Sequence, residues 1–172
     1  MDIKPFIRLI PDFPRPGSTY HDITTLLKDR AGFRATMDAL AAHFKGRQID
    51  KIAAVEWRGF VFGAALADRL GAGFVPVRRL GKLPAQTVSR EYDFEHVGER
   101  IEMQVDAVAA GESVVVLNDV LASGESTTAA IQLVRDMGGR VVEAAFLAEV
   151  PSAAGRKRVE SLGVPVFALA AF

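Results

Sequence analysis

The residues best suited to chemistry lie between positions 114 and 127. An apolar run, Val114–Leu117, leads into Asn118 and Asp119, and a turn of small and hydroxyl-bearing residues follows. Backbone N–H groups at the start of a helix, beside serine and threonine hydroxyls, form a good phosphate-binding cradle. Asp119 precedes that turn and could accept hydrogen bonds from sugar hydroxyls. The pattern therefore predicts a sugar-phosphate site, although an acidic strand end followed by a serine N-cap would look the same.

Several familiar kinds of site are missing from the sequence. The turn has no lysine in P-loop spacing, and no GxGxxG fingerprint follows any strand, which argues against a P-loop ATPase and a dinucleotide dehydrogenase. The chain has no cysteine, which excludes disulfides, thiolate metal sites and cysteine nucleophiles. Histidine and aspartate do not cluster at metal-ligand spacing.

Alternating strand and helix patterns would position the turn. Apolar runs predict strands at residues 51–57, 73–79, 100–105, 113–119, 141–150 and 164–172. Apolar residues at helical spacing predict helices at 29–45, 59–70, 126–137 and 153–162. This alternation predicts an α/β fold, with a mainly parallel twisted sheet and helices on both faces. Ligands bind beyond the carboxyl ends of such strands, where Asn118 and Asp119 stand.

Two segments fall outside this alternation. The first 28 residues are rich in proline and glycine and predict an irregular hood over a core at 29–172. Residues 80–99 have no helical period and predict a long loop, with room for a strand around Tyr92–Phe94. The length of 172 residues suits a single domain.

Composition limits the expected partners. Lysine and arginine total 21, as do aspartate and glutamate, and this neutrality argues against a nucleic-acid-coating protein. No apolar run approaches the roughly 18 residues of a membrane span, and the first residues lack the apolar core of a signal peptide. The lack of cysteine suits a reducing compartment, so we expect a cytoplasmic protein.

The 114–127 stretch resembles the phosphoribosyl-pyrophosphate-binding motif of type I phosphoribosyltransferases. That motif is an apolar strand, two acids, two apolar residues and a loop rich in threonine and glycine. Three further segments are similar, in order, to signatures of the adenine phosphoribosyltransferase branch of that family: Pro11–Gly17 with His21–Thr24, Glu56–Gly63 and Val77–Pro84. The resemblance covers roughly residues 7–170.

The resemblance implies a purine salvage enzyme that converts adenine and phosphoribosyl pyrophosphate into AMP and pyrophosphate, with Mg²⁺ as cofactor. The transition state resembles an oxocarbenium ion, so the site must hold the 5′-phosphate, neutralise pyrophosphate and exclude water. In this family Mg²⁺ is held mostly by substrate oxygens, so no protein ligand is assigned to it. The resemblance also implies a homodimer, for which the residues offer only the apolar faces around Phe60–Leu70.

The resemblance assigns the phosphoribosyl pyrophosphate to three groups of residues. Asn118 and Asp119 would face the ribose hydroxyls, with Asp119 near the developing positive charge as a catalytic residue. The 5′-phosphate cradle would consist of Ala122, Ser123, Gly124, Glu125 and Ser126. Arg58, Arg78 and Lys82 would bind pyrophosphate.

It assigns the base to two further segments. The backbone near Thr19 and His21 would read the edge of adenine. Residues 83–99 match the mobile catalytic loop of the family, in which Glu95 would handle a proton near the adenine nitrogens as a second catalytic residue.

Some positions depart from the family pattern. Asn118 replaces the first acid of the motif, so it can bond to ribose but supplies no negative charge. Glu125 replaces a glycine and would repel a phosphate unless its side chain points away. The other departures are Ser123 and Ser126 for threonines, Trp57 for a small residue and His96 for an aromatic one.

Two other hypotheses therefore stay open. One is a non-catalytic module of the same fold that senses phosphoribosyl pyrophosphate or a nucleotide, which Asn118 and Glu125 motivate. The other is a phosphoribosyltransferase for a 6-oxopurine base, because residues 18–24 would read the base through backbone hydrogen bonds that a sequence does not reveal.

Overall fold

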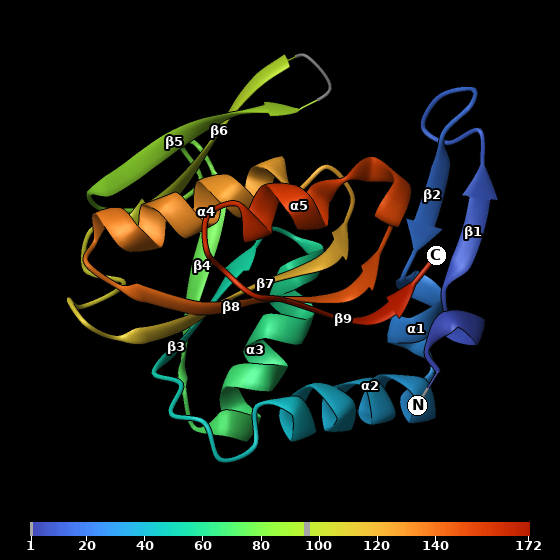
Figure 1. Cartoon of the computed structure of the whole chain (residues 1–172), viewed down its shortest axis with the longest axis horizontal. Helices are drawn as coiled ribbons and strands as arrows, with labels where there is room; N and C mark the ends of the chain where they lie inside the picture. Colours follow the sequence, from blue (N-terminus) through green and yellow to red (C-terminus); the bar gives the residue numbers. More distant parts are fainter. Residues whose placement is uncertain (1, 95–96) are drawn as a thin grey trace.

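The core of the fold is a seven-stranded sheet (Figure 1). The structure, a computed structural model, describes residues 2–94 and 97–172. Across the sheet the order is β5 (Thr87–Phe94), β6 (Val97–Gln104), β4 (Gly73–Arg79), β3 (Lys51–Val55), β7 (Ser113–Leu121), β8 (Arg140–Glu149) and β9 (Val166–Ala171). The five strands from β4 to β9 pair in parallel, whereas β6 is antiparallel to both β4 and β5. The carboxyl ends of the parallel strands thus share one edge.

Helices cover both faces of the sheet, which confirms the predicted α/β class (Figure 1). They are α1 (Thr24–Lys28), α2 (Arg30–His43), α3 (Arg58–Leu70), α4 (Glu125–Asp136) and α5 (Gly155–Glu160), with 3₁₀ turns at Lys4–Phe6 and Pro151–Ala153. Alternation along β7 separates two cores: Val115 and Leu117 pack with α2 and α3, while Val114 and Val116 pack with α4 and α5. In the described part of the chain, no helix has the length and apolar content to cross a membrane.

Helix ends follow local chemistry that the sequence already indicates. The side chain of Asp29 caps α2 by accepting a hydrogen bond of 2.7 Å from the Gly32 N–H. Helix α3 ends at Gly71, whose φ of 66° lies in the left-handed region that glycine adopts freely. These two ends agree with the helices expected at 29–45 and 59–70.

Two segments are more regular than predicted. The N-terminal hood contains an antiparallel hairpin, β1 (Arg8–Pro11) with β2 (Thr19–Asp22), followed by α1. Much of residues 80–99 belongs to the β5–β6 hairpin rather than to a loop. The apolar–polar alternation of these strands is hard to see in the sequence because Arg90 and Glu99 lie on the same face of the hairpin as its apolar side chains. In the register, Arg90 is paired with Ile101 and Glu99 with Tyr92.

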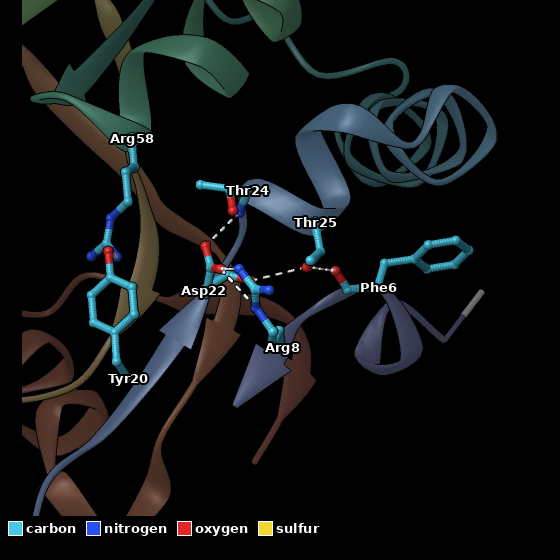
Figure 2. A network of polar contacts seen from close by, with 7 residues as sticks. All are labelled: Phe6, Arg8, Tyr20, Asp22, Thr24, Thr25 and Arg58. Atoms are coloured by element: carbon cyan, nitrogen blue, oxygen red, sulfur yellow. Dashed lines mark hydrogen bonds and ion pairs between the residues drawn. The ribbon is translucent and has the colours of Figure 1, made fainter. Parts of the chain in front are cut away.

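A buried carboxylate fastens the N-terminal hairpin (Figure 2). Asp22 is 5% exposed and pairs across the strands with Arg8, which donates bonds of 3.1 and 2.5 Å to Oδ2. The Thr24 N–H donates to Oδ1 at 2.9 Å. Hydrogen bonds from Thr24, and then from Arg8, lower the pKa of Asp22 from 3.8 to about 2.

Asp22→Asn should lower the free energy of unfolding by about 2 kcal/mol at pH 7, because the buried acceptor loses the charge that strengthens its hydrogen bonds from Arg8 and Thr24. The pKa of Asp22 is lower in the folded than in the unfolded chain, so its contribution is complete above about pH 4 and disappears as the pH falls towards 2. Urea unfolding of both proteins across this range would measure the difference. A gap between them that does not change with pH would contradict the assignment.

Candidate active site

A cavity of about 680 Å³ opens where the carboxyl ends of the parallel strands meet the N-terminal hairpin. Its walls come from β2, the β3–α3 junction, the β7–α4 turn and the β5–β6 hairpin. Of the predicted site residues, the cavity brings together Thr19, His21, Arg58, Asn118, Asp119, Ala122, Ser123, Gly124 and Ser126. These residues span more than 100 positions of the chain and meet because the parallel strands end at one edge.

An ion pair between partly buried Arg58 and buried Asp119 lines the cavity. Asp119 is 2% exposed, and its Oδ2 lies 2.8 Å from Nε of Arg58. A Cβ at Gly59 would lie 3.1 Å from the Leu117 carbonyl, so glycine allows the start of α3 to approach the end of β7. Burial raises the pKa of the Asp119 carboxyl, and the charge of Arg58 offsets part of that effect.

Asp119 keeps free capacity for a ligand. Within the described part of the chain, its buried Oδ2 has no partner in hydrogen-bonding geometry, although Arg58 stands nearby. Asn118 Oδ1 is engaged locally and accepts a 2.9 Å bond from the Asp119 N–H. Asp119 also lines the cavity, so its carboxylate presents negative charge beside any sugar bound there.

The N-terminal hairpin closes the cavity with Tyr20 and His21. Nη1 of Arg58 donates a 2.7 Å bond to the Tyr20 hydroxyl, and Figure 2 shows the two side chains meeting. The His21 ring packs edge-on against Phe172 with centroids 4.9 Å apart. Burial, and then the charge of Arg58, lower the pKa of His21, so its ring is neutral at pH 7 and can both donate and accept a hydrogen bond.

The β7–α4 turn has the geometry of an anion cradle. Gly124 adopts a φ of 76° and α4 begins at Glu125, so the first N–H groups of the helix lie at the turn. Ser123 and Ser126 line the cavity, and Thr127 joins them. Backbone donors and hydroxyls therefore gather beside Asp119, as the spacing predicts.

Glu125 is absent from the residues that line the cavity. Its Oε1 lies 3.3 Å from Nη2 of Arg158 on α5, and its Oε2 accepts a 3.3 Å bond from the Ser123 hydroxyl. The carboxylate is thus held on the α5 side of the turn.

Two predicted cations are also absent from the cavity lining. Arg78 donates from Nε to Glu56 Oε2 and from Nη1 to the Lys82 carbonyl, each at 2.8 Å, and neither Arg78 nor Lys82 lines the cavity of its own chain. Arg79 lines it instead, because successive side chains of β4 point to opposite faces. Glu95 lies outside the described residues.

The structure adds cavity residues that the sequence reasoning did not assign to the site: Tyr20, Arg79, Tyr92 and Glu99. The Tyr92 hydroxyl donates a 2.7 Å bond to Glu99 Oε2, and burial raises the pKa of that tyrosine. Arg79 Nε lies 3.6 Å from the same glutamate oxygen. Alternation within β4 was the signal available for Arg79, whereas Tyr92 and Glu99 depend on the hairpin register.

Comparison with known proteins defines the class to which this fold and cavity belong. Residues 22–166 match the family described as "Phosphoribosyl transferase domain", and this range includes the Arg58–Asp119 ion pair and the whole cradle. The chain belongs to that family.

Within the family, its relatives are adenine phosphoribosyltransferases. It is 45% identical to the enzyme of Parvibaculum lavamentivorans and 48% identical to that of Nitrosospira multiformis, in each case over 100% of this chain and 98% of the relative. The crystal structure of the Thermoanaerobacter pseudethanolicus enzyme superposes with a TM-score of 0.95 at 46% identity, covering 99% of this chain and 98% of the other. The Saccharomyces cerevisiae enzyme, complexed with adenine and an iminoalditol bisphosphate, gives 0.92 at 35% identity, with coverage of 97% and 96%.

Proposed function

We propose that this chain makes AMP in purine salvage, by transferring the phosphoribosyl group of phosphoribosyl pyrophosphate to adenine with release of pyrophosphate. The observation that carries the proposal is the convergence of a phosphate cradle, a buried carboxylate and a cationic wall in one cavity. The two full-length relatives described above are named for this activity and support the choice of base.

Each wall of the cavity suits one part of the reaction. The cradle at residues 122–126 binds the 5′-phosphate and fixes the sugar. Asp119 faces the ribose and stabilises the positive charge that develops as the glycosidic C–O bond breaks. Arg58 and Arg79 offer positive charge to the departing pyrophosphate. The N-terminal β1–β2 hairpin covers the side of the cavity proposed for the base, which limits the access of water to the cationic ribose of the transition state.

The base lies against β2 in this proposal. Thr19 and His21 supply backbone groups and a neutral imidazole at the cavity wall. The yeast relative was solved with adenine bound and the Giardia lamblia relative with 9-deazaadenine, the latter at 32% identity. Glu95 is proposed to handle the proton on the adenine, on the strength of the sequence resemblance alone.

Mg²⁺ is the proposed cofactor. Among the described residues, no group of three or more histidine, aspartate or glutamate side chains is arranged to hold a metal ion. We propose that substrate oxygens supply most of its ligands, as the family resemblance implies. When bound, the ion would neutralise charge on the departing pyrophosphate.

A cytoplasmic homodimer is the proposed state of the protein. Apolar side chains at the start of α3 and on β4 are exposed: Trp57 by 57%, Val61 by 37% and Phe74 by 37%. A second copy of the chain would cover them. In such a dimer, Arg78 and Lys82 remain candidates for pyrophosphate binding. Sedimentation velocity would give the mass in solution.

The decisive experiment is incubation of the purified protein with phosphoribosyl pyrophosphate, Mg²⁺ and a purine base. AMP should form from adenine, with hypoxanthine and guanine as poor competitors. If only hypoxanthine or guanine were used, the 6-oxopurine alternative would hold. If calorimetry showed binding of phosphoribosyl pyrophosphate but no AMP formed, the sensor hypothesis would be supported. Restoration of turnover by Asn118→Asp would then identify Asn118 as the cause of the inactivity.

Arg58→Ala should raise the KM for phosphoribosyl pyrophosphate by about tenfold, because one cavity cation and its charge-assisted hydrogen bonds are lost. The loss of Arg58 should also raise the pKa of Asp119 further, since that arginine now opposes the effect of burial. The acidic limb of the pH–kcat profile should therefore move to higher pH. Unchanged KM and an unmoved acidic limb would refute the role.

Glu95→Ala should lower kcat more than it raises the KM for either substrate, because a proton-handling group acts mainly in the transition state. Steady-state kinetics at pH 7 would measure both parameters. Equal losses in kcat and in affinity would assign Glu95 to binding instead.

A further inference from the structure

Glu125 places a carboxylate at the first residue of α4, inside the sequence stretch that forms the cradle. Its side chain is 21% exposed and has two partners, the guanidinium of Arg158 and the hydroxyl of Ser123, both at 3.3 Å. The arginine comes from α5, 33 positions later in the chain, and is 49% exposed. Among the ion pairs of the described residues, Arg158 is the cation that pairs with this carboxylate.

A bound phosphate would change this arrangement. Ser123 lines the cavity, so its hydroxyl would be drawn to donate to the phosphate and would leave Glu125. Arg158 would then be the remaining partner of the carboxylate. If Glu125 swung towards the cavity, two like charges would meet at short range, and the phosphate would bind more weakly.

Helix α5 packs directly on the cradle and so brings Arg158 beside Glu125. A Cβ at Gly155, the first residue of α5, would lie 2.1 Å from the carbonyl oxygen of Ala122. A Cβ at Gly124 would lie 3.1 Å from the carbonyl oxygen of Gly155. The two backbones are thus in direct contact, one turn of helix from the Arg158–Glu125 pair.

We propose that Arg158 is a positioning residue for phosphoribosyl pyrophosphate: it holds the Glu125 carboxylate on the α5 side of the cradle and so keeps the 5′-phosphate site free of negative charge. The proposal rests on the proposed function of the cradle. It explains how a glutamate occupies a position next to the phosphate, and it makes Arg158 and Glu125 an interacting pair.

The test is a double-mutant cycle with a matched control. Arg158→Ala should raise the KM for phosphoribosyl pyrophosphate by about tenfold with little change in kcat, because the released carboxylate repels the ground state and the transition state alike. Lys157→Ala removes the same charge from the neighbouring position of α5, where the side chain is exposed, and should change KM by less than about twofold.

Rescue separates positioning from a merely structural role. In an Arg158→Ala background, Glu125→Gln should recover most of the lost affinity, because the amide keeps the size of the side chain without its charge. Arg158→Lys should also retain most of the affinity. If Arg158→Ala is no worse than Lys157→Ala, or if Glu125→Gln brings no rescue, the inference is wrong.

Calorimetric titration with AMP, which carries the same 5′-phosphate, measures the double-mutant cycle as binding affinities, without any need for catalysis. If the wild type is active but the cycle shows no coupling between Arg158 and Glu125, only the role of Arg158 is overturned. A wild type that neither forms AMP nor binds it would overturn the proposed function, and the inference that rests on it.

Discussion

Asp119→Asn is expected to lower kcat for AMP formation by about 100- to 1,000-fold, because it removes a preorganised negative charge from a water-poor site. The asparagine keeps the size and shape of the side chain. It loses the charge that faces both Arg58 and the cationic sugar. The KM for phosphoribosyl pyrophosphate should change much less, since the ground-state ribose is neutral at C1.

Two controls make this result interpretable. Asp38→Asn changes the same group on the surface of α2, where the aspartate pairs with Arg69, and should leave the kinetics within about twofold. Thermal unfolding should show that Asp119→Asn remains folded, because burial already raises the pKa of that carboxyl and a neutral group costs less to bury. A kcat within tenfold of wild type would remove Asp119 from the mechanism.

The charge of Asp119 also predicts a pH dependence. Its pKa in the folded protein lies above the usual value, so the carboxyl takes up a proton at a higher pH than an exposed aspartate does. Activity that depends on the ionised carboxylate should therefore decline, as the pH is lowered, at a higher pH than it would for a carboxyl of pKa 3.8. Asp119→Asn should abolish that limb, which a pH–kcat profile of both proteins would reveal.

Local sequence predicted the parts of the site that are themselves local. The strand–turn–helix unit at β7 and α4 follows from an apolar run, two polar residues and a serine-rich turn within about 25 residues. The Asp29 cap and the Gly71 end of α3 obey the same kind of short-range rule. Each of these features is fixed by neighbours along the chain.

Features that depend on long-range contacts were not predictable in this way. The polar residues of β5 acquire partners only once the register of the β5–β6 hairpin is set. The Tyr20–Arg58 bond joins residues 38 positions apart. No periodicity within one segment encodes such meetings.

The contact between α5 and the cradle also joins segments that are far apart in the sequence, and Gly155→Ala tests it. The new Cβ would meet the Ala122 carbonyl oxygen at 2.1 Å, a distance that only movement of backbone can relieve. Because Ala122 belongs to the cradle, we expect the KM for phosphoribosyl pyrophosphate to rise by about 10- to 100-fold, and the free energy of unfolding to fall by about 3 kcal/mol.

Gly73→Ala is the matched control for this substitution. A Cβ at Gly73 would lie 2.9 Å from the Lys51 side chain, whose flexible end can move aside. Gly73 is the first residue of β4, at the amino ends of the parallel strands and thus at the opposite end from the cavity. It should cost about 1 kcal/mol or less and leave KM unchanged. If Gly155→Ala destabilised the protein but left the KM within twofold, the cradle would be held in place by contacts other than α5. If it changed neither quantity, α5 would not constrain the cradle.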